Sequence, residues 1–226
     1  WRVWLAAMFI LYPLWFAYCL ILFVQMLSGG IARVLVRKKR LLVYELAVCS
    51  NKEPLLPMGI QWAQATRDNV ADLFRDDPRR KKTFLRFIDK GYYGVILYHD
   101  TQWVSYGWMS KPDTLGPPHL PLGIQQEKVY WLFYQHTAQN YRGRGFYKCV
   151  LHLQAMHALR EIETARVLID TRPDNIASRK GILAVGFEPK GMIDTLELRM
   201  PRVKSWVWGS WDMDADHPRL DGGTNS

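Results

Sequence analysis

Residues 140–148 have the sequence NYRGRGFYK, which sets two glycines and two arginines in one short turn. An apolar, aromatic run typical of a strand precedes this turn at residues 128–137, and residues 145–163 follow it with apolar residues at helical spacing. Glycine lets the backbone turn sharply without a Cβ in the way, and a helix N-terminus offers free N–H groups and partial positive charge. This order can bind a phosphate group, although a solvated turn explains the same residues when they are taken alone.

Two common phosphate-binding motifs do not fit the turn. A P-loop requires G-x-x-x-x-G-K-[ST], which the chain lacks. The dinucleotide-binding fingerprint requires a third glycine where Lys148 stands. It also belongs to a βαβ unit early in a fold, whereas this turn comes late in the chain. The sequence of the turn alone therefore does not identify a phosphate-binding site, and the segments around it must be considered.

The segments around the turn predict an α/β (α+β) fold, with a mixed, mostly antiparallel sheet flanked by helices. Strands are expected at residues 41–48, 58–65, 92–99, 102–110, 128–137 and 165–171, with a strand pair at 187–200 that turns at Lys190 and Gly191. Helices are expected at 66–74, capped by Thr66 or Asp68, and at 78–90, 145–163 and 173–186.

Residues 59–200 resemble the GNAT superfamily, the acyl-CoA-dependent N-acyltransferases, through two motifs. The segment TAQNYRGRGFYKCVL is similar to the family's pyrophosphate loop, [QR]-x-x-G-x-[GA]. Gly143 and Gly145 stand at its glycines, and Asn140 stands where Gln or Arg is usual. The segment DNIASRKGILAVGF, at 174–187, is similar to the family's later N-x-x-[AS]…G-F segment. The resemblance implies a GNAT-type fold.

The resemblance also implies that acetyl-CoA, or another acyl-CoA, is the co-substrate. Backbone amides of the turn would hold the CoA pyrophosphate, and backbone groups at the end of the preceding strand would pair with the pantetheine arm. Asn175 would lie near that arm, although it also fits a helix cap. The implied cofactor-binding residues are Gln135, Thr137, Tyr141, Arg142, Gly143, Arg144, Gly145, Phe146 and Asn175.

Two departures from the family pattern concern catalysis. Many GNAT enzymes carry a tyrosine seven residues after the motif asparagine as general acid, where this chain has Ile182. Many also place a carboxylate on the strand before the loop, whereas Glu127 stands only at the entrance of that strand. The expected mechanism is attack of a neutral amine on the thioester, with His136, or Glu127 through water, as base. Tyr134 or Tyr147 would be the acid, and sheet packing is the alternative role of His136 and Tyr134.

The formal net charge of +9 indicates an anionic partner. The cations cluster after an apolar N-terminal segment and around the glycine turn, and no nucleic-acid-binding module is recognised, so nucleic acid is not an expected partner. The three cysteines have the spacing of neither a metal site nor a disulfide framework, so the sequence predicts no metal and a reducing compartment.

Residues 3–27 contain no charged residue. At about 1.5 Å per residue, a helix of this length crosses the roughly 30 Å hydrocarbon core of a bilayer, and a membrane helix tolerates the kink expected at Pro13. Five cations follow at 33–40 and only Arg2 precedes, so the positive-inside rule places the C-terminal part in the cytoplasm. These cations could also hold anionic lipid headgroups. A signal peptide and a buried core helix are the alternatives.

Four regions are therefore predicted: a transmembrane helix at 1–28, a basic juxtamembrane connector and strand at 29–57, a GNAT-like acyltransferase domain at 58–200 and a Trp-rich tail at 201–226. The expected function is a membrane-anchored, cytoplasm-facing N-acyltransferase that acts on an unidentified amine at or near the membrane.

The alternative is a GNAT-fold subunit without catalysis that serves as an anchored interaction module in a membrane complex. Ile182 favours this alternative. So does the tail with Trp206, Trp208 and Trp211, because tryptophans are common interface anchors, although these rings could equally pack on the domain or enter the headgroup region. A membrane-protein partner would then bind through the transmembrane helix or the tail.

Overall fold

The computed structural model describes residues 36–47, 49, 52–198 and 206–220. Its backbone divides into two compact units. The described part of the smaller unit comprises residues 36–39, 196–198 and 206–207, and there Lys39 Nζ lies 2.5 Å from Glu197 Oε2. The larger unit comprises the described residues of 40–195 and 208–220, and it holds the candidate site.

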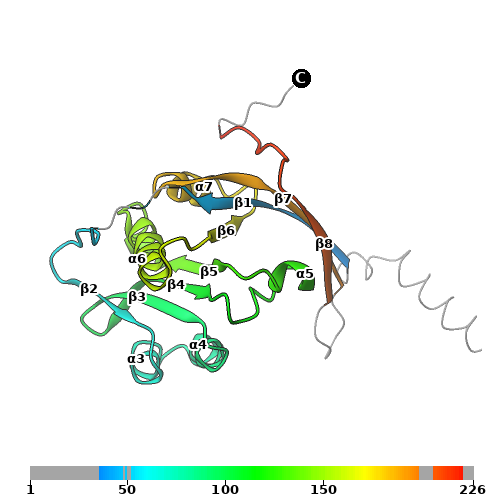
Figure 1. Cartoon of the computed structure of the whole chain (residues 1–226). Helices are drawn as coiled ribbons and strands as arrows, with labels where there is room; N and C mark the ends of the chain where they lie inside the picture. The colour runs from blue at the N-terminus through cyan, green and yellow to red at the C-terminus, as the bar shows by residue number, and fades with distance from the viewer. Residues whose placement is uncertain (1–35, 48, 50–51, 199–205, 221–226) are drawn as a thin grey trace, which may run out of the picture. The chain divides into compact units, whose positions relative to one another are not determined.

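Eight strands follow the order β2-β3-β4-β5-β6-β1-β7-β8 in one sheet (Figure 1). β5 and β6 are parallel, whereas β2–β3, β3–β4, β4–β5 and β1–β6 are antiparallel. The predicted mixed, mostly antiparallel sheet is therefore confirmed. The strands are β1 Val36–Leu46, β2 Ile60–Gln64, β3 Tyr93–His99, β4 Gln102–Ser110, β5 Tyr130–Thr137, β6 Val167–Thr171, β7 Phe187–Leu198 and β8 Trp206–Asp212.

The first two helices of the described residues begin where the sequence predicts them. Thr66 and Asn69 form a capping box at the first of them, so Thr66 and not Asp68 is the cap, and Asp77 caps the next helix, with Pro78 in its first turn. A four-residue helix, α5, lies in a Pro/Gly-rich segment whose sequence does not predict it. The helices are α3 Arg67–Leu73, α4 Pro78–Asp89, α5 Leu122–Gln125, α6 Phe146–Glu161 and α7 Ile176–Leu183.

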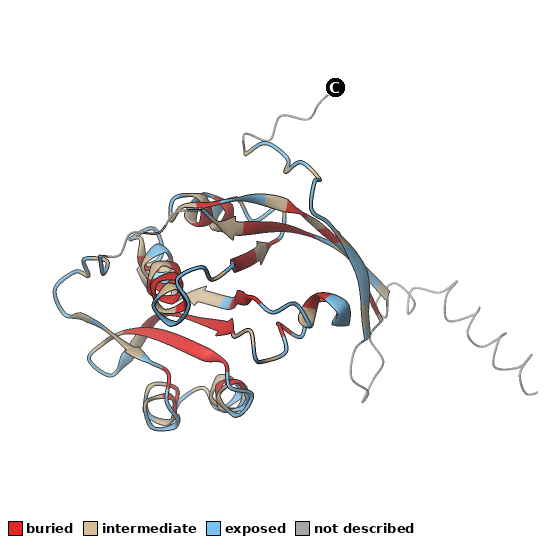
Figure 2. Ribbon diagram, in the orientation of Figure 1, coloured by how far each residue is buried: buried red, intermediate tan, exposed pale blue. Residues whose placement is uncertain are grey.

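Helices cover both faces of the central strands of the larger unit. α6 lies on one face, where Val150 and Leu153 pack in one cluster with Leu132 and Ile169 of β5 and β6 (Figure 1). α3 and α4 lie on the other face, where the aromatic side chain of Phe84 packs against the sheet. Buried residues concentrate in the strands between these helices (Figure 2). Burial on both faces explains why the β5 sequence is an almost continuous apolar run.

The predicted strand pair at 187–200 is wrong. β7 continues through Lys190 and Gly191 without a turn, and Gly191 has a positive φ of 84° within the strand. A Cβ on Gly191 would lie 2.0 Å from the backbone oxygen of Asp212, so this glycine serves a close backbone approach and not a hairpin turn. The neighbouring strand comes instead from the tail, as β8.

Trp211 of the tail packs within the larger unit. The ring of Trp211 lies 5.8 Å from that of Trp131, and its indole N–H donates to the Lys190 carbonyl oxygen at 2.9 Å. Packing on the domain therefore explains Trp211. An interface role for Trp206 and Trp208 stays a prediction.

Among the described residues, no helix is both long and apolar enough to cross a membrane. The transmembrane helix predicted at residues 3–27 lies outside the described residues, so the anchor stays a prediction.

Candidate functional site

The glycine turn has the geometry that its sequence predicts. Gly143 and Gly145 have positive φ values of 76° and 84°, a region that glycine enters without strain, and Gly145 is the residue that precedes α6. A Cβ added to Gly143 would meet no described residue within 4 Å, so no packing within the described part of the chain explains the glycine. Arg142 and Arg144 are exposed beside it. The turn thus offers an open, cationic space in front of a helix N-terminus.

The free amides of the turn begin at Gly143. The amide of Tyr141 donates to the Ala138 carbonyl at 2.9 Å, and that of Arg142 donates to the Gln139 carbonyl at 3.2 Å, so neither is available to a ligand. Within the part of the chain that the structure describes, no backbone acceptor is found for the amides of residues 143–148. The first turn of any helix leaves such groups unpaired, and they attract anions. Phe146 is buried, so it can contribute only its backbone.

The strands β5 and β6 separate beside this turn. Their parallel pairing ends at Leu132 and Ile169, although β5 continues to Thr137. A cavity of about 210 Å³ lies at this opening. Its lining includes the predicted residues Tyr134, Gln135 and Asn175. The structure therefore brings the end of β5 and the start of α7 to one cavity next to the glycine turn.

A β-bulge interrupts β5 at this opening. Tyr106 of β4 pairs with His136 and Trp108 pairs with Phe133, so two β5 residues, Tyr134 and Gln135, face Gly107 alone. Tyr134 has a positive φ of 55°, which is uncommon for a tyrosine, and about half of its side chain is exposed. Backbone strain of this kind clusters at functional sites, because it aims backbone or side-chain groups out of the regular ladder.

The bulge also places the side chain of Gln135. A Cβ on Gly107 would lie 1.6 Å from the Gln135 Oε1 atom, so glycine at 107 makes room for this amide. Gln135 Nε2 donates to Gln154 Oε1 at 2.9 Å. The Nε2 group is thus used inside the fold, whereas the buried Oε1 atom has no hydrogen-bond partner among the described residues. The predicted pairing with pantetheine would use the backbone of Gln135.

His136 lies in an aromatic cluster on the α4 face of the sheet. Its ring stacks on Tyr106 with centroids 5.6 Å apart and lies 5.8 Å from Trp103. Burial, together with the charges of Arg80 and Arg142, lowers the pKa of His136. The imidazole is therefore neutral at pH 7, which is the form that a general base requires.

Two further predicted residues have defined partners. The Thr137 hydroxyl lies 2.9 Å from that of Ser105, and the Thr137 carbonyl accepts from Arg142 Nε at 3.3 Å. Asn175 caps α7, because its Oδ1 accepts from the Ser178 amide at 3.2 Å. The helix-cap role of Asn175 is therefore present, and it coexists with a place in the cavity lining.

Glu127 is not brought to the site. It precedes the start of β5, whereas the bulge lies near the other end of that strand, seven positions along the chain from Glu127. Tyr130 and Tyr134 alone are about 13 Å apart at about 3.3 Å per strand residue, and Glu127 does not line the cavity at the opening. The strand geometry therefore gives no support to Glu127 as a base, and that role stays a prediction.

Sequence reasoning missed a histidine–aspartate pair in the cavity lining. His119 Nε2 lies 3.0 and 3.1 Å from the two carboxylate oxygens of Asp170, and the Trp131 indole donates to the same carboxylate at 2.8 Å. Asp170 is the next-to-last residue of β6, where a carboxylate near the end of an apolar strand is a recognisable signal. His119 stands in an irregular loop that gives no such signal.

The family's usual acid has no counterpart on α7. Ile182 is fully buried in the core cluster beneath that helix. Tyr147 of α6 instead lies against α7, with its hydroxyl 2.7 Å from Ser178 Oγ, and burial raises the pKa of Tyr147 to about 12. Its phenol therefore carries a proton at pH 7, and it lines the cavity. Within the described ranges, no group of three metal-ligating side chains is found.

Comparisons with known proteins support the fold alone. No protein-family model matches the chain, and no curated protein does. A Drosophila protein of known structure aligns at 12% identity with a TM-score of 0.52, over 75% of this chain and 54% of that one. A conserved protein of unknown function from Staphylococcus epidermidis aligns at 10% identity with a TM-score of 0.50, over 75% and 66% of the two chains.

An acetyltransferase of the GNAT family from Colwellia psychrerythraea aligns at 18% identity, over 74% of this chain and 57% of that one. The TM-score of this alignment is 0.49. This chain spans little more than half the length of the Drosophila protein and of the Colwellia enzyme.

Proposed function

We propose that this chain is an acyl-CoA-dependent N-acyltransferase of the GNAT type. One observation carries the proposal: a turn with two positive-φ glycines stands at the N-terminus of α6, directly beside the opening between β5 and β6. Free amides, helix charge and arginine side chains suit a pyrophosphate, and the strand end suits an extended arm that reaches from it to the bulge.

The residues fit acyl-CoA on their own geometry. The amides of Gly143, Arg144, Gly145 and Phe146 would hold the pyrophosphate, with the Arg142 and Arg144 side chains adding charge. The backbone of Gln135 would pair with the pantetheine arm. When bound, acyl-CoA supplies a thioester whose acyl carbon bonds to the amine nitrogen as the carbon–sulfur bond breaks.

Side chains of this chain would then transfer the protons, and a backbone N–H would stabilise the developing negative charge. Neutral His136 accepts the proton that the attacking amine loses, because its lowered pKa keeps the ring unprotonated at pH 7. Tyr134, at the bulge, and Tyr147, across the cavity, are phenols that can protonate the departing thiolate. The irregular backbone of the bulge can direct an N–H toward the developing oxyanion.

The experiment that tests this function measures the release of CoA thiol. The purified full chain, in detergent, should consume acetyl-CoA slowly without an acceptor and faster with a suitable amine. Ile182 favours the second candidate, a GNAT-fold subunit without catalysis. Binding of CoA without any turnover across a broad panel of amines would support that candidate and contradict the enzyme.

The acceptor would lie at a membrane if residues 3–27 form an anchor, with the acyltransferase domain in the cytoplasm where acyl-CoA is found. We expect the full chain to sediment with membranes and to resist carbonate extraction. Leu14→Arg combined with Phe16→Arg should release it, because each arginine costs about 3 kcal/mol at the centre of a membrane helix. Recovery of the unaltered chain in the soluble fraction would contradict the anchor.

A further inference from the structure

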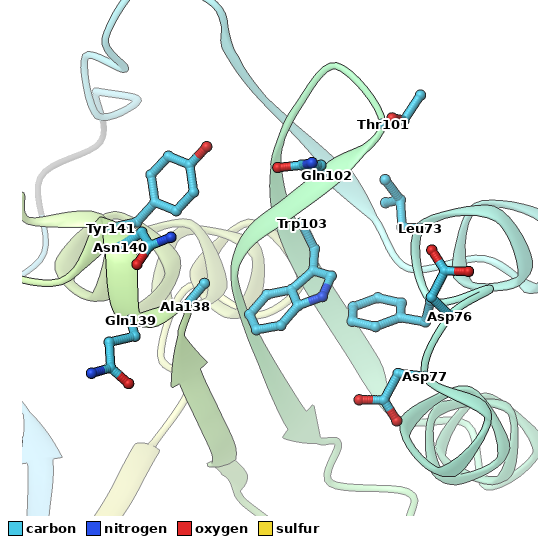
Figure 3. A pocket seen from close by; sticks show the side chains of 11 residues that line it. Leu73, Asp76, Asp77, Thr101, Gln102, Trp103, Ala138, Gln139, Asn140 and Tyr141 are labelled. Carbon is cyan, nitrogen blue, oxygen red and sulfur yellow. The ribbon is translucent and has the colours of Figure 1, made fainter.

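A second cavity, of about 430 Å³, lies on the other side of the β5 end. The loop between α3 and α4, the turn between β3 and β4 and the segment after β5 surround it (Figure 3). It stands on the α4 side of β4, whereas the opening between β5 and β6 lies at the other edge of β5. Its polar and aromatic lining includes Asp76, Asp77, Gln102, Trp103, Gln139 and Asn140.

The charge of this pocket is opposite to that of the glycine turn. Of the described residues that line it, two are aspartates and none is lysine or arginine. Three carboxamides, from Gln102, Gln139 and Asn140, supply both donors and acceptors. An anionic ligand such as a polyphosphate is disfavoured here, whereas a cation with hydrogen-bonding groups is favoured. The two sides of the β5 end are therefore suited to different ligands.

The walls of the pocket are held in place by contacts within the chain. Asp77 accepts from the Arg80 amide at 2.9 Å, and its other carboxylate oxygen lies 2.6 Å from Arg80 Nη1. The Arg80 guanidinium lies 4.9 Å above the Trp103 ring, which stacks on Phe74 with centroids 5.7 Å apart. The charge of Asp77 is thus matched internally. No ion pair to exposed Asp76 is found among the described residues, so Asp76 is the carboxylate left for a ligand.

The pocket also lies next to the proposed base. The rings of Trp103 and His136 are 5.8 Å apart, and Ala138, which lines the pocket, follows His136 by two residues. An ammonium that binds in this pocket must first release one proton to water. The neutral imidazole of His136 beside it can then accept the second proton, which the amine loses on attack.

We propose that this pocket binds the acceptor, and that the acceptor is a protonated amine on a body rich in hydroxyl or amide groups. The proposal rests on the acyltransferase function. Asp76 holds the ammonium charge, the carboxamides hold the polar body, and the rigid Trp103 wall sets the position of the amine beside His136. Amines with a purely apolar body, and amines that also carry an anionic group, are poor acceptors.

Three probes isolate the parts of this proposal. Glucosamine is cationic and rich in hydroxyl groups, N-acetylglucosamine keeps the body but not the charge, and hexylamine keeps the charge but not the body. Each is titrated into the full chain in detergent, without acyl-CoA, and the affinity is followed by calorimetry or ligand-observed NMR. Glucosamine should bind at least fivefold more tightly than either of the other probes.

Asp76→Asn should weaken glucosamine binding about fivefold, the size expected for one exposed ion pair, and leave N-acetylglucosamine unchanged. The control is Asp72→Asn, which removes an exposed carboxylate on α3 that does not line the pocket and should change neither affinity. The proposal is overturned if glucosamine does not bind at millimolar concentration, or if Asp76→Asn has no more effect than Asp72→Asn. Because acyl-CoA is absent, these results are separate from any failure of CoA binding, which would overturn the proposed function instead.

Discussion

His136→Ala is expected to lower acetyl transfer about 100-fold while CoA affinity stays unchanged. Loss of a positioned general base costs roughly 10²- to 10⁴-fold, and the lower end applies where water can partly replace the base. The ring of His136 stacks on Tyr106 and lies outside the glycine turn, so its removal leaves the cofactor side intact. The measurement is the rate of CoA thiol release with a responsive amine, beside a calorimetric titration of CoA.

The pH dependence of acetyl transfer tests the role of His136 as the base independently. Burial, Arg80 and Arg142 lower the pKa of His136, so the base becomes protonated only below its ordinary value of about 6.5. When the rate is expressed per concentration of neutral amine, it should therefore hold from pH 7 down to about 6.5 and fall below that, and His136→Ala should lose this acidic limb.

The matched control for the histidine is His99→Ala. His99 is half-exposed at the end of β3, where it lies 3.4 Å from Asp100, and its loss should leave the rate within twofold. A rate unaffected by His136→Ala would contradict the assignment of the base. His119, held by Asp170 in the lining of the other cavity, would then be the described imidazole to test.

Gly143→Val is expected to weaken CoA binding at least tenfold with the fold retained. Valine is strained at a φ of 76° and would fill space that is open in the turn, so the amides would rotate away from the pyrophosphate. A tenfold loss corresponds to about 1.4 kcal/mol of binding free energy. The fold should survive because none of the residues that the structure describes would lie within 4 Å of a Cβ at that position.

A second glycine provides the control for this change. Gly123 in α5 also has no neighbour within 4 Å of its missing Cβ, and its φ is not positive. Gly123→Ala should leave CoA affinity unchanged. Unaltered affinity in Gly143→Val would show that the glycine turn is an ordinary solvated loop.

The local parts of this site could be predicted because the signals are local. The two glycines at 143 and 145 indicated a tight turn because glycine enters the positive-φ region without strain, and apolar runs of the right length predicted β5, β6 and α6. The wrong prediction of a strand pair at 187–200 also came from a local signal. Gly191 suggests a turn when its neighbours are considered alone, and only the approach of Asp212 from the tail shows why a glycine stands there.

The non-local parts of the site carry no local signal. The bulge at Tyr134 has no glycine or proline of its own, and its space is provided by Gly107 on the adjacent strand. His119 and Asp170 are 51 positions apart and meet only because a loop folds over the end of β6. The pocket with Asp76 combines three segments that are adjacent only in the folded chain (Figure 3). Residue types alone could not have predicted these juxtapositions.

Binding of acyl-CoA at the turn before α6 is the step on which the proposed enzyme activity of this chain depends most. The direct measurement is a calorimetric titration of acetyl-CoA into the full chain in detergent, repeated with Gly143→Val. We predict saturable binding of one acetyl-CoA per chain, weakened at least tenfold in the variant. Absence of binding to the unaltered chain at millimolar acetyl-CoA would contradict both the cofactor assignment and the proposed enzyme.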